Sequence, residues 1–123
     1  MAQLPPTLKK GSKGDAVKGL QNALNERASQ GVTVDGNFGP ATETAVKGYQ
    51  GAASLTVDGI AGPATWQALY VYVVQRGDSL SKVAQENFGD ANRWTDIYNM
   101  NQAFISDPDK ITPGQVLTLP IYE

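Results

Sequence analysis

Apolar residues in the first part of the chain recur with the spacing of one helix face. Val17, Leu20 and Leu24 lie three or four positions apart, as residues on the buried side of a helix do. Asp15 is a good N-cap for this helix, and Gly31 is a stop signal beyond its end. The pattern predicts a helix that begins at Asp15 and has a narrow apolar face.

Two prolines predict the starts of two further helices. Pro40 and Pro63 each follow a glycine and suit the first helical turn, where the missing N–H of proline is not needed. The side chains expected to face inward are Ala45, Val46 and Tyr49 in the second helix and Trp66 and Leu69 in the third. Three short helices joined by glycine turns predict a compact all-α unit.

An internal repeat runs through these helices. Residues 35–42 are Asp-Gly-Asn-Phe-Gly-Pro-Ala-Thr, and residues 58–65 are Asp-Gly-Ile-Ala-Gly-Pro-Ala-Thr. Val34 and Val57 each precede the Asp-Gly pair and predict short extended entries into tight turns. Residues 8–70 are therefore expected to form three similar helix-bearing units.

The pattern changes after the third helix. Residues 71–75 are rich in β-formers and end at Arg76-Gly-Asp, and residues 116–119 form a second such run that stops at Pro120. These two runs predict two strands.

Two helices are expected between the strands. Their apolar positions are Leu80, Val83, Ala84 and Phe88 in the first and Trp94, Ile97 and Tyr98 in the second. Ser79 or Asp78 is expected to cap the first of them, and Gly89 to end it. The order β-α-α-β predicts an antiparallel pair with both helices on one face.

The sequence thus predicts two domains, 1–70 and 71–123, in a mainly α protein with a small α+β module. Almost no linker separates them near Tyr70, so the modules are expected to touch. Each is close to the lower size limit for an independent hydrophobic core, which leaves little room for a deep active-site cleft.

Composition narrows the functions that are open. The chain of 123 residues contains neither Cys nor His, so thiolate metal sites and the commonest general base are both missing. A net charge of −2 argues against nucleic acid, whose binders need a basic stripe. No run approaches the roughly 18 apolar residues of a membrane span, and the start MAQLPPTLKK lacks the apolar centre of a signal peptide. We expect no cofactor and no metal.

The first half resembles a known family. Residues 8–69 are similar to the three-helix peptidoglycan-binding domain of cell-wall hydrolases, through residues 8–17 (Leu-Lys-Lys-Gly-Ser-Lys-Gly-Asp-Ala-Val), 34–42 and 57–66. The motif covers the whole predicted all-α unit. The resemblance implies a three-helix fold that recognises peptidoglycan.

The second half resembles a LysM domain. The similarity covers residues 72–120, through residues 72–80 (Tyr-Val-Val-Gln-Arg-Gly-Asp-Ser-Leu), Trp94, Asn101 and residues 111–120 (Ile-Thr-Pro-Gly-Gln-Val-Leu-Thr-Leu-Pro). It implies a βααβ fold that recognises N-acetylglucosamine in peptidoglycan or chitin. In that family the sugar lies between the loop after the first strand and the loop before the second.

The LysM resemblance and the Asp-Gly repeats of the first half supply the candidate glycan-binding residues. In the LysM-like half they are Gly77, Asp78, Ser79, Leu80, Ile105, Asp107, Pro108, Asp109, Lys110 and Ile111. In the first half they are Asp35, Gly36, Phe38, Asp58 and Gly59. The expected partner is peptidoglycan, with chitin-type oligosaccharides as a further possibility, and the expected location is the cell wall, periplasmic or extracellular. Leu80 and Ile111 would supply small apolar dents for acetyl methyl groups.

Several of these residues also have structural explanations. Asp-Gly at 35 and 58 is first of all turn chemistry, in which Gly supplies a positive φ and Asp bonds nearby amides. Phe38 is the best aromatic surface candidate, because its counterpart in the second repeat is Ala61. Trp94, by contrast, is expected in the core.

Two other classes of function stay open beside wall binding. A glycosidase needs a pair of carboxylates flanking a cleft, but the repeat-related turn positions of Asp35 and Asp58 explain that pair without chemistry. We therefore expect a protein that is not an enzyme. The acidic stretch 104–110 resembles LysM variants of phage-tail and other assembly proteins, so the alternative is an assembly adaptor whose LysM module binds protein.

Overall fold

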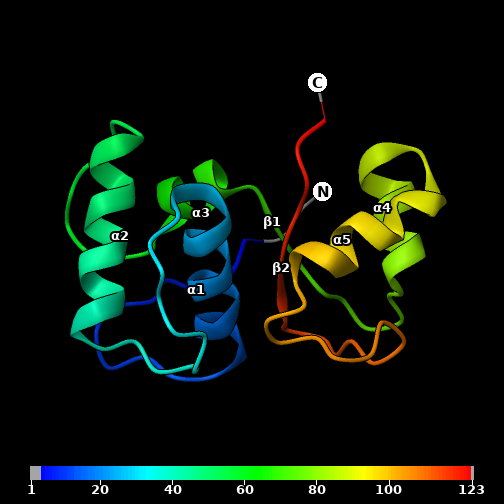
Figure 1. Cartoon of the computed structure of the whole chain (residues 1–123), viewed down its shortest axis with the longest axis horizontal. Helices are drawn as coiled ribbons and strands as arrows, with labels where there is room; N and C mark the ends of the chain where they lie inside the picture. The colour runs from blue at the N-terminus through cyan, green and yellow to red at the C-terminus, as the bar shows by residue number, and fades with distance from the viewer. Residues whose placement is uncertain (1–3, 123) are drawn as a thin grey trace.

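The structure is a computed structural model that describes residues 4–122. Residues 1–3 and 123, which the predicted domain ranges include, lie outside the described residues. The elements are α1 (Asp15–Ala28), α2 (Pro40–Ala52), α3 (Pro63–Leu69), β1 (Val71–Val73), α4 (Leu80–Phe88), the short 3₁₀ helix η1 (Ala91–Arg93), α5 (Trp94–Met100) and β2 (Val116–Thr118). The predicted class, mainly α with a small α+β module, is confirmed (Figure 1).

Local sequence signals place most helix ends correctly. Pro40 and Pro63 are the first residues of α2 and α3, as predicted. Ser79 caps α4 by accepting a hydrogen bond from the Lys82 amide at 3.2 Å, and Gly89 ends that helix in the left-handed region with φ 73°. Proline at a helix start and glycine at a helix end act through their own backbone geometry, so neither depends on distant contacts.

The ends of α1 differ from the prediction. Gly14, not Asp15, is its N-cap, and Ser29 in the left-handed region ends the helix before Gly31 is reached. Asn25 explains the early end. Its side chain donates to the Val32 carbonyl at 2.8 Å and accepts from the Val32 amide at 2.7 Å, which turns the chain back directly after the helix.

A buried glutamine organises each copy of the internal repeat. The Gln21 side-chain oxygen accepts from the amides of Asp35 and Gly36 at 3.0 and 2.9 Å. Its nitrogen lies within hydrogen-bonding distance of the Asp35 carboxylate, the Asn37 carbonyl and the Thr42 hydroxyl, at 2.9 to 3.1 Å.

Gln50 repeats this arrangement in the second copy. Its side-chain oxygen accepts from the amides of Asp58 and Gly59, and its nitrogen contacts the Asp58 carboxylate, the Ile60 carbonyl and the Thr65 hydroxyl. The sequence repeat is therefore also a repeat of one hydrogen-bond network.

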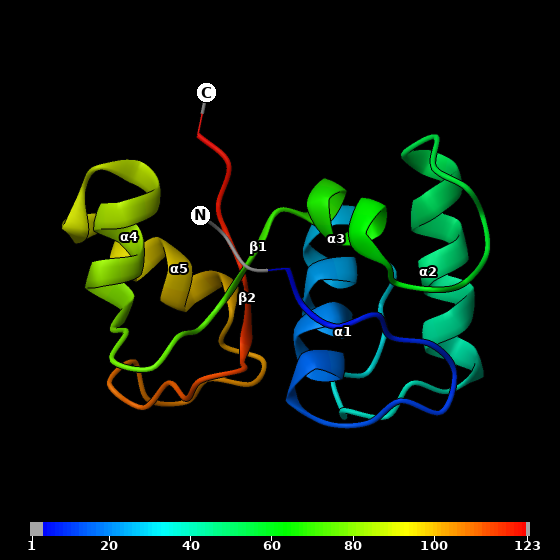
Figure 2. The same ribbon diagram turned by 180° about the vertical axis from the view of Figure 1, so that it is seen from behind.

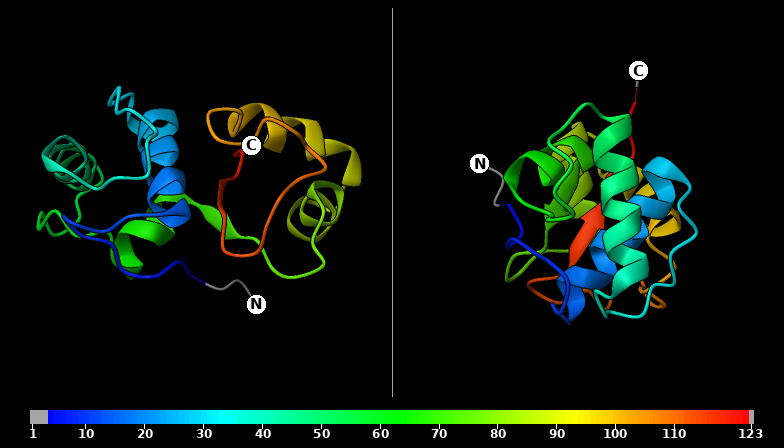
Figure 3. Two further views of the ribbon diagram at one scale, coloured as in Figure 1. Left: turned by 90° about the horizontal axis from the view of Figure 1, so that it is seen from below. Right: turned by 90° about the vertical axis from the view of Figure 1, so that its left-hand side faces the viewer.

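The two strands form a pair that lies between the two groups of helices (Figures 1 and 2). β1 pairs antiparallel with β2, with Tyr72 opposite Leu117 at the centre. Seen from below, the pair again lies between α1 and the α4–α5 helices (Figure 3). The predicted antiparallel pairing is confirmed.

Each face of this pair belongs to a different hydrophobic core. Val74, Leu117 and Leu119 pack with Val83 and Ile97 of the helices α4 and α5. On the opposite face, the buried residues are Val73 and Val116, which join the core of α1, α2 and α3. Because successive side chains of a strand point to opposite faces, one short pair of strands serves both cores.

Polar contacts fix α1 on the strands as well. Asn22 lies in the middle of α1 and is 4% exposed. Its side-chain nitrogen lies within hydrogen-bonding distance of the Thr118 hydroxyl, the Asn101 side-chain oxygen and the Met100 carbonyl, at 3.0, 3.0 and 3.1 Å. Further along α1, Arg27 donates to the carbonyls of Leu69 and Leu119. The predicted contact between the modules is confirmed, and it is both apolar and hydrogen-bonded.

Candidate functional site

A groove of about 340 Å³ lies between the start of α4 and the loop that precedes β2. Its lining residues are Asp78, Ser79, Leu80, Ser81, Trp94, Pro108, Asp109 and Ile111. Six of these, from two loops far apart in the sequence, are candidate residues. The two loops expected to flank a ligand therefore do meet.

Asp78 holds the first loop in shape. One carboxylate oxygen accepts from the Tyr72 hydroxyl at 2.6 Å and the Gln75 amide at 2.7 Å, and the other lies 3.6 Å from the Lys82 ammonium. The Asp78 side chain is only 2% exposed, so its carboxylate is committed to these contacts. Burial, reinforced by the bond to Asp78, raises the pKa of Tyr72. Asp78 thus stabilises the loop between β1 and α4, and the N-cap of α4 is Ser79 alone.

Serine hydroxyls form the rim of the groove at the start of α4. Ser79 and Ser81 are both exposed, and their hydroxyl oxygens lie 3.2 Å apart. The first amides of a helix have no carbonyl partner within that helix, so this end carries hydrogen-bond donors as well. The rim therefore offers uncharged hydrogen-bond donors and acceptors.

The loop before β2 is held by a buried side chain and by a turn. Ile105 is 2% exposed and packs in the core, and the Asp107 carboxylate accepts from the Asp109 amide at 2.9 Å. These contacts leave Pro108, Asp109 and Ile111 at the groove. The candidates Gly77, Ile105, Asp107 and Lys110 are not among the groove's lining residues.

The apolar floor consists of Leu80 and Trp94. Leu80 is only 3% exposed, so a ligand would touch the edge of a side chain that mainly fills the core. Trp94 was expected in the core but is half-buried and lines the groove. Its size explains the difference, because an indole at the start of a helix can pack one face and leave another open.

The Asp-Gly positions of the first module build turns. Asp35 and Asp58 accept from the backbone amides of Asn37 and Ile60, both at 2.9 Å. These bonds, with those from the repeated glutamines, hold the pKa of both carboxyls below the usual range. Gly36 and Gly59 are buried and adopt positive φ of 78° and 74°. The turn interpretation therefore accounts for all four residues.

Phe38 is not a surface aromatic. It is 3% exposed and lies in the core with Val17 and Val46, so the expectation of a stacking platform there is wrong. Its carbonyl accepts from the Gly11 amide and its amide donates to the Ser12 carbonyl, whereas its repeat counterpart Ala61, which is 0% exposed, exchanges both backbone hydrogen bonds with Leu8. Both side chains therefore point inward.

A second hollow, of about 310 Å³, lies beside the second repeat. Its lining residues include Thr56, Asp58, Ile60 and Pro63. Ile60 is 37% exposed, so it gives this hollow an accessible apolar surface. Of the first-module candidates, Asp58 lines this hollow, whereas Phe38 and Gly59 do not.

The described residues contain neither a metal-binding cluster nor a membrane-spanning helix. Within residues 4–122, no group of three or more acidic side chains is arranged to hold a metal ion. Across the same residues, no helix is both long enough and apolar enough to cross a membrane.

Comparison with known families matches both halves of this fold. Residues 13–69 match the family described as "Putative peptidoglycan binding domain", and residues 72–120 match the LysM domain. The chain thus contains a peptidoglycan-binding domain of this family followed by a LysM domain. The domain boundary at residue 70 stays a prediction. Val71, Val73 and Val116 lie beyond this boundary in the sequence but pack in the core of the first domain.

Three relatives illustrate the similarity. The potassium binding protein Kbp of Escherichia coli is 43% identical over 49 residues, which are 40% of this chain and 33% of that protein. The SleB N-terminal domain is 36% identical, with a TM-score of 0.50 over 52% of this chain and 88% of that one. A peptidoglycan-binding protein from Clostridioides difficile, solved with glutamine hydroxamate, is 39% identical, with a TM-score of 0.50 over 52% of this chain and 40% of that one. The chain thus spans a third of the length of its curated relative Kbp.

Proposed function

We propose that this chain binds peptidoglycan at the bacterial cell wall without cleaving it. The observation that carries the proposal is the groove between α4 and the loop before β2, in a domain whose family resemblance implies N-acetylglucosamine recognition. The relative from Clostridioides difficile is itself called a peptidoglycan-binding protein, which supports the same ligand for the first domain.

The chemistry of the groove fits an N-acetylated sugar. Ser79 and Ser81 offer hydroxyls at the rim, while Trp94 and Ile111 offer apolar surface beside them. An N-acetyl sugar needs this combination, because its hydroxyls and amide form hydrogen bonds while its ring faces and acetyl methyl pack on apolar atoms. The same chemistry accepts chitin-type oligosaccharides.

The groove does not suit hydrolysis. Of its two carboxylates, Asp78 is committed to Tyr72, Gln75 and Lys82. Retaining and inverting glycosidases both need a pair of available carboxyl groups, one of them kept protonated by an apolar site. Asp109 alone does not make such a pair, so the proposed activity is binding.

The first domain contributes a second contact with the wall. The hollow at Asp58 and Ile60 is an accessible cavity of that domain. Because α1 is packed and hydrogen-bonded to β2, the two domains form one packed unit. A rigid link raises the effective concentration of the second site once the first is occupied, provided that both reach glycan together. Location at the wall, on the periplasmic or extracellular side, follows from this role.

Pelleting with purified peptidoglycan sacculi tests the proposal. The full chain is used, because residues 1–70 alone would lack Val116 of the shared core. Ile111→Asp places a charge in the groove, and Val57→Asp places the same charge at a position that is 54% exposed and outside the lining of both the groove and the hollow. We expect the wild type and Val57→Asp to pellet and Ile111→Asp to pellet less.

Two results would contradict the proposal. Soluble sugar fragments released into the supernatant would mean that the protein is an enzyme. Equal pelleting of Ile111→Asp and Val57→Asp, with unchanged circular dichroism, would remove the groove as the glycan site. In that case the assembly adaptor, with a protein bound to the LysM domain, becomes the better explanation.

A further inference from the structure

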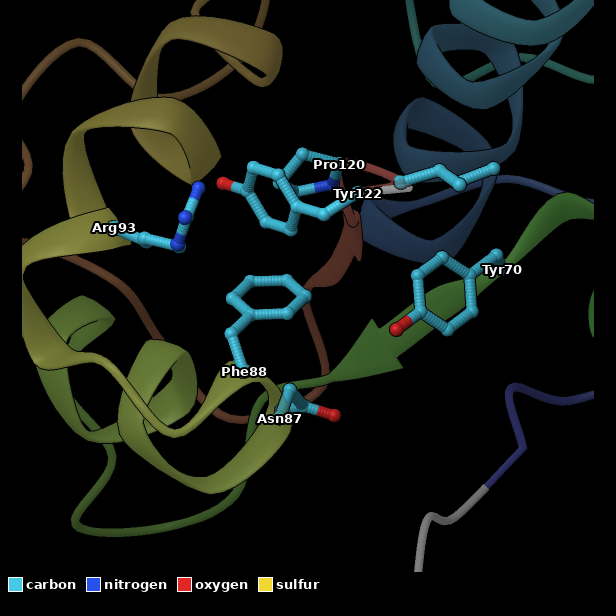
Figure 4. A pocket seen from close by; sticks show the side chains of 7 residues that line it. Tyr70, Asn87, Phe88, Arg93, Pro120 and Tyr122 are labelled. Atoms are coloured by element: carbon cyan, nitrogen blue, oxygen red, sulfur yellow. The ribbon is translucent and has the colours of Figure 1, made fainter.

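A third cavity, of about 530 Å³, lies at the other end of α4 from the groove. The groove begins at Leu80 and Ser81, whereas this cavity is lined by Asn87 and Phe88, the last two residues of the helix. Its other walls are Tyr70, which follows α3, Arg93 of η1 and residues 120–122 (Figure 4). Neither family resemblance assigns a role to this place.

Exposed apolar side chains concentrate around this cavity. Six large hydrophobic residues are exposed in the described chain, and three of them, Tyr70, Ile121 and Tyr122, line the cavity. Single exposed hydrophobic residues are ordinary, but a cluster of them around a hollow indicates a binding site. Phe88 adds a third aromatic ring.

One wall of the cavity is held in place before any ligand arrives. The Tyr122 ring meets the Phe88 ring edge to face, with 5.0 Å between centroids and 86° between planes. The Tyr122 hydroxyl donates to the Asp96 carboxylate at 2.6 Å, and the Arg93 guanidinium lies 4.0 Å from the Tyr122 ring centroid. These contacts fix the ring although it is 40% exposed.

Tyr70 forms the facing wall in an unfavourable backbone conformation. It follows α3 with φ 58°, in the left-handed region that glycine prefers and bulky residues avoid. Its hydroxyl makes no hydrogen bond to any residue of the described chain, and it is turned towards the space beside Phe88 (Figure 4). A strained residue with an uncommitted polar group is a candidate for function.

Asn87 supplies a second polar group from the helix. Its side-chain nitrogen donates to the Val83 carbonyl at 2.8 Å, which fixes the amide and leaves its oxygen as an acceptor. That oxygen points to the Tyr70 side of the cavity (Figure 4). The Tyr70 hydroxyl can therefore donate, and the Asn87 oxygen can accept, a hydrogen bond in a cavity that aromatic rings line.

The size and charge of the cavity select the class of ligand. A volume of about 530 Å³ lies within the range of small-ligand sites, roughly 300 to 1,000 Å³, whereas a protein partner needs a broad surface. A purely apolar ligand would leave the Tyr70 hydroxyl and the Asn87 oxygen unpaired. An anion is disfavoured because the Asp90 carboxylate, 3.8 Å from the Arg93 guanidinium, offsets the positive charge of Arg93, and a second carboxylate, that of Asp96, accepts from the Tyr122 hydroxyl.

We propose that this cavity is a second saccharide site of the LysM half, which binds one or two neutral pyranose rings between Tyr70 and the Phe88–Tyr122 pair. The apolar C–H face of a pyranose stacks on an aromatic ring, while its hydroxyl edge meets the Tyr70 hydroxyl and the Asn87 oxygen. The choice of a glycan as ligand rests on the function proposed above, but the site does not share its residues with the groove.

Titration of the full chain with N-acetylglucosamine tetramer, followed residue by residue in two-dimensional amide NMR spectra, tests this proposal. We expect shifts at two separate sets of amides, one around Ser79 and Ile111 and one around Tyr70, Asn87 and Tyr122. Shifts at the groove alone would overturn the second site and leave the proposed function intact. Shifts at the cavity alone would support the second site and contradict the groove. No shifts at either place would overturn both.

Tyr70→Gly separates a binding role of the ring from a structural one. Glycine adopts the left-handed conformation without strain, so the melting temperature of this variant should equal or exceed that of the wild type. Loss of the ring and hydroxyl should weaken tetramer binding at the cavity by at least about fivefold. Val57→Ala, at another exposed apolar residue, is the matched control and should change neither value. Unchanged cavity shifts in Tyr70→Gly would contradict the proposal.

Discussion

Gly19 of α1 lies directly against Val116 of β2. A methyl group added at Gly19 would come within 2.5 Å of both the Val116 Cβ and the Val116 carbonyl oxygen. No other side chain fits between the helix and the strand at this point. The close approach is what lets one pair of strands serve as a wall for two domains.

This relationship predicts that two similar substitutions have opposite effects. Gly19→Ala should destabilise the protein by about 1 to 3 kcal/mol, because the strand backbone must move. Gly51→Ala, in the exposed part of α2 with its nearest neighbour at 3.9 Å, should stabilise it by about 0.5 to 1 kcal/mol through helix propensity. Urea unfolding of both variants measures the difference. Equal effects would mean that the domains do not pack as described.

The repeated glutamines should carry much of the stability of the first domain. Gln50→Leu leaves the amides of Asp58 and Gly59 without their acceptor, and each loss of a buried partner costs about 1 to 3 kcal/mol. We expect a lower urea midpoint with an unchanged slope. Gln67→Leu, at an exposed position of α3, is the control and should stay within about 0.5 kcal/mol of the wild type. A Gln50→Leu variant as stable as this control would rule out the network as a source of stability.

Acid should weaken the two Asp turns. Hydrogen bonds from the Asn37 and Ile60 amides lower the folded-state pKa of Asp35 and Asp58, respectively. A lowered folded-state pKa means that the stabilisation is complete above the unfolded value of about 3.9 and is lost as pH falls through the folded value. The melting temperature should therefore drop below about pH 4, and less steeply in the Asp35→Asn, Asp58→Asn double variant. Parallel pH curves for the two proteins would contradict this origin.

Trp94 should report binding in the groove, whereas Trp66 should not. Trp94 is half-buried and lines the groove, but Trp66 is 0% exposed and donates its indole N–H to the Pro6 carbonyl. Adding N-acetylglucosamine tetramer should shift or quench the fluorescence, and Trp94→Phe should abolish the change. A response that persists in Trp94→Phe would locate the ligand elsewhere.

The sequence predicts features that local chemistry determines. Pro40, Pro63 and Gly89 act through their own backbone geometry, and the structure confirms all three. Of the two predicted caps for α4, Ser79 and Asp78, the structure selects Ser79. The two loops of the groove are likewise found together, because the resemblance to LysM names both. The four helix ends depend on residues next to them in the chain, whereas the meeting of the two loops follows from the resemblance alone.

Features that depend on packing between distant segments are harder to predict. Phe38 is buried because the N-terminal segment pairs across it, and Trp94 is partly open at a groove that two loops distant in the sequence form together. The strand face that packs on α1 depends on Gly19, which in the sequence is only a glycine inside a helix. Periodicity shows which side chains are apolar, but it does not show which of two domains will cover them.

The most direct test of the account is the affinity for sacculi of the full chain with its two proposed wall contacts removed singly and together. Ile111→Asp addresses the LysM groove and Ile60→Asp the hollow of the first domain. Because a rigid link makes the second contact intramolecular, each single variant should lose about tenfold or more in pelleting affinity, and the double variant should lose more than either single variant. Single variants that bind as tightly as the wild type, in a protein that remains folded, would contradict two-site binding to the wall.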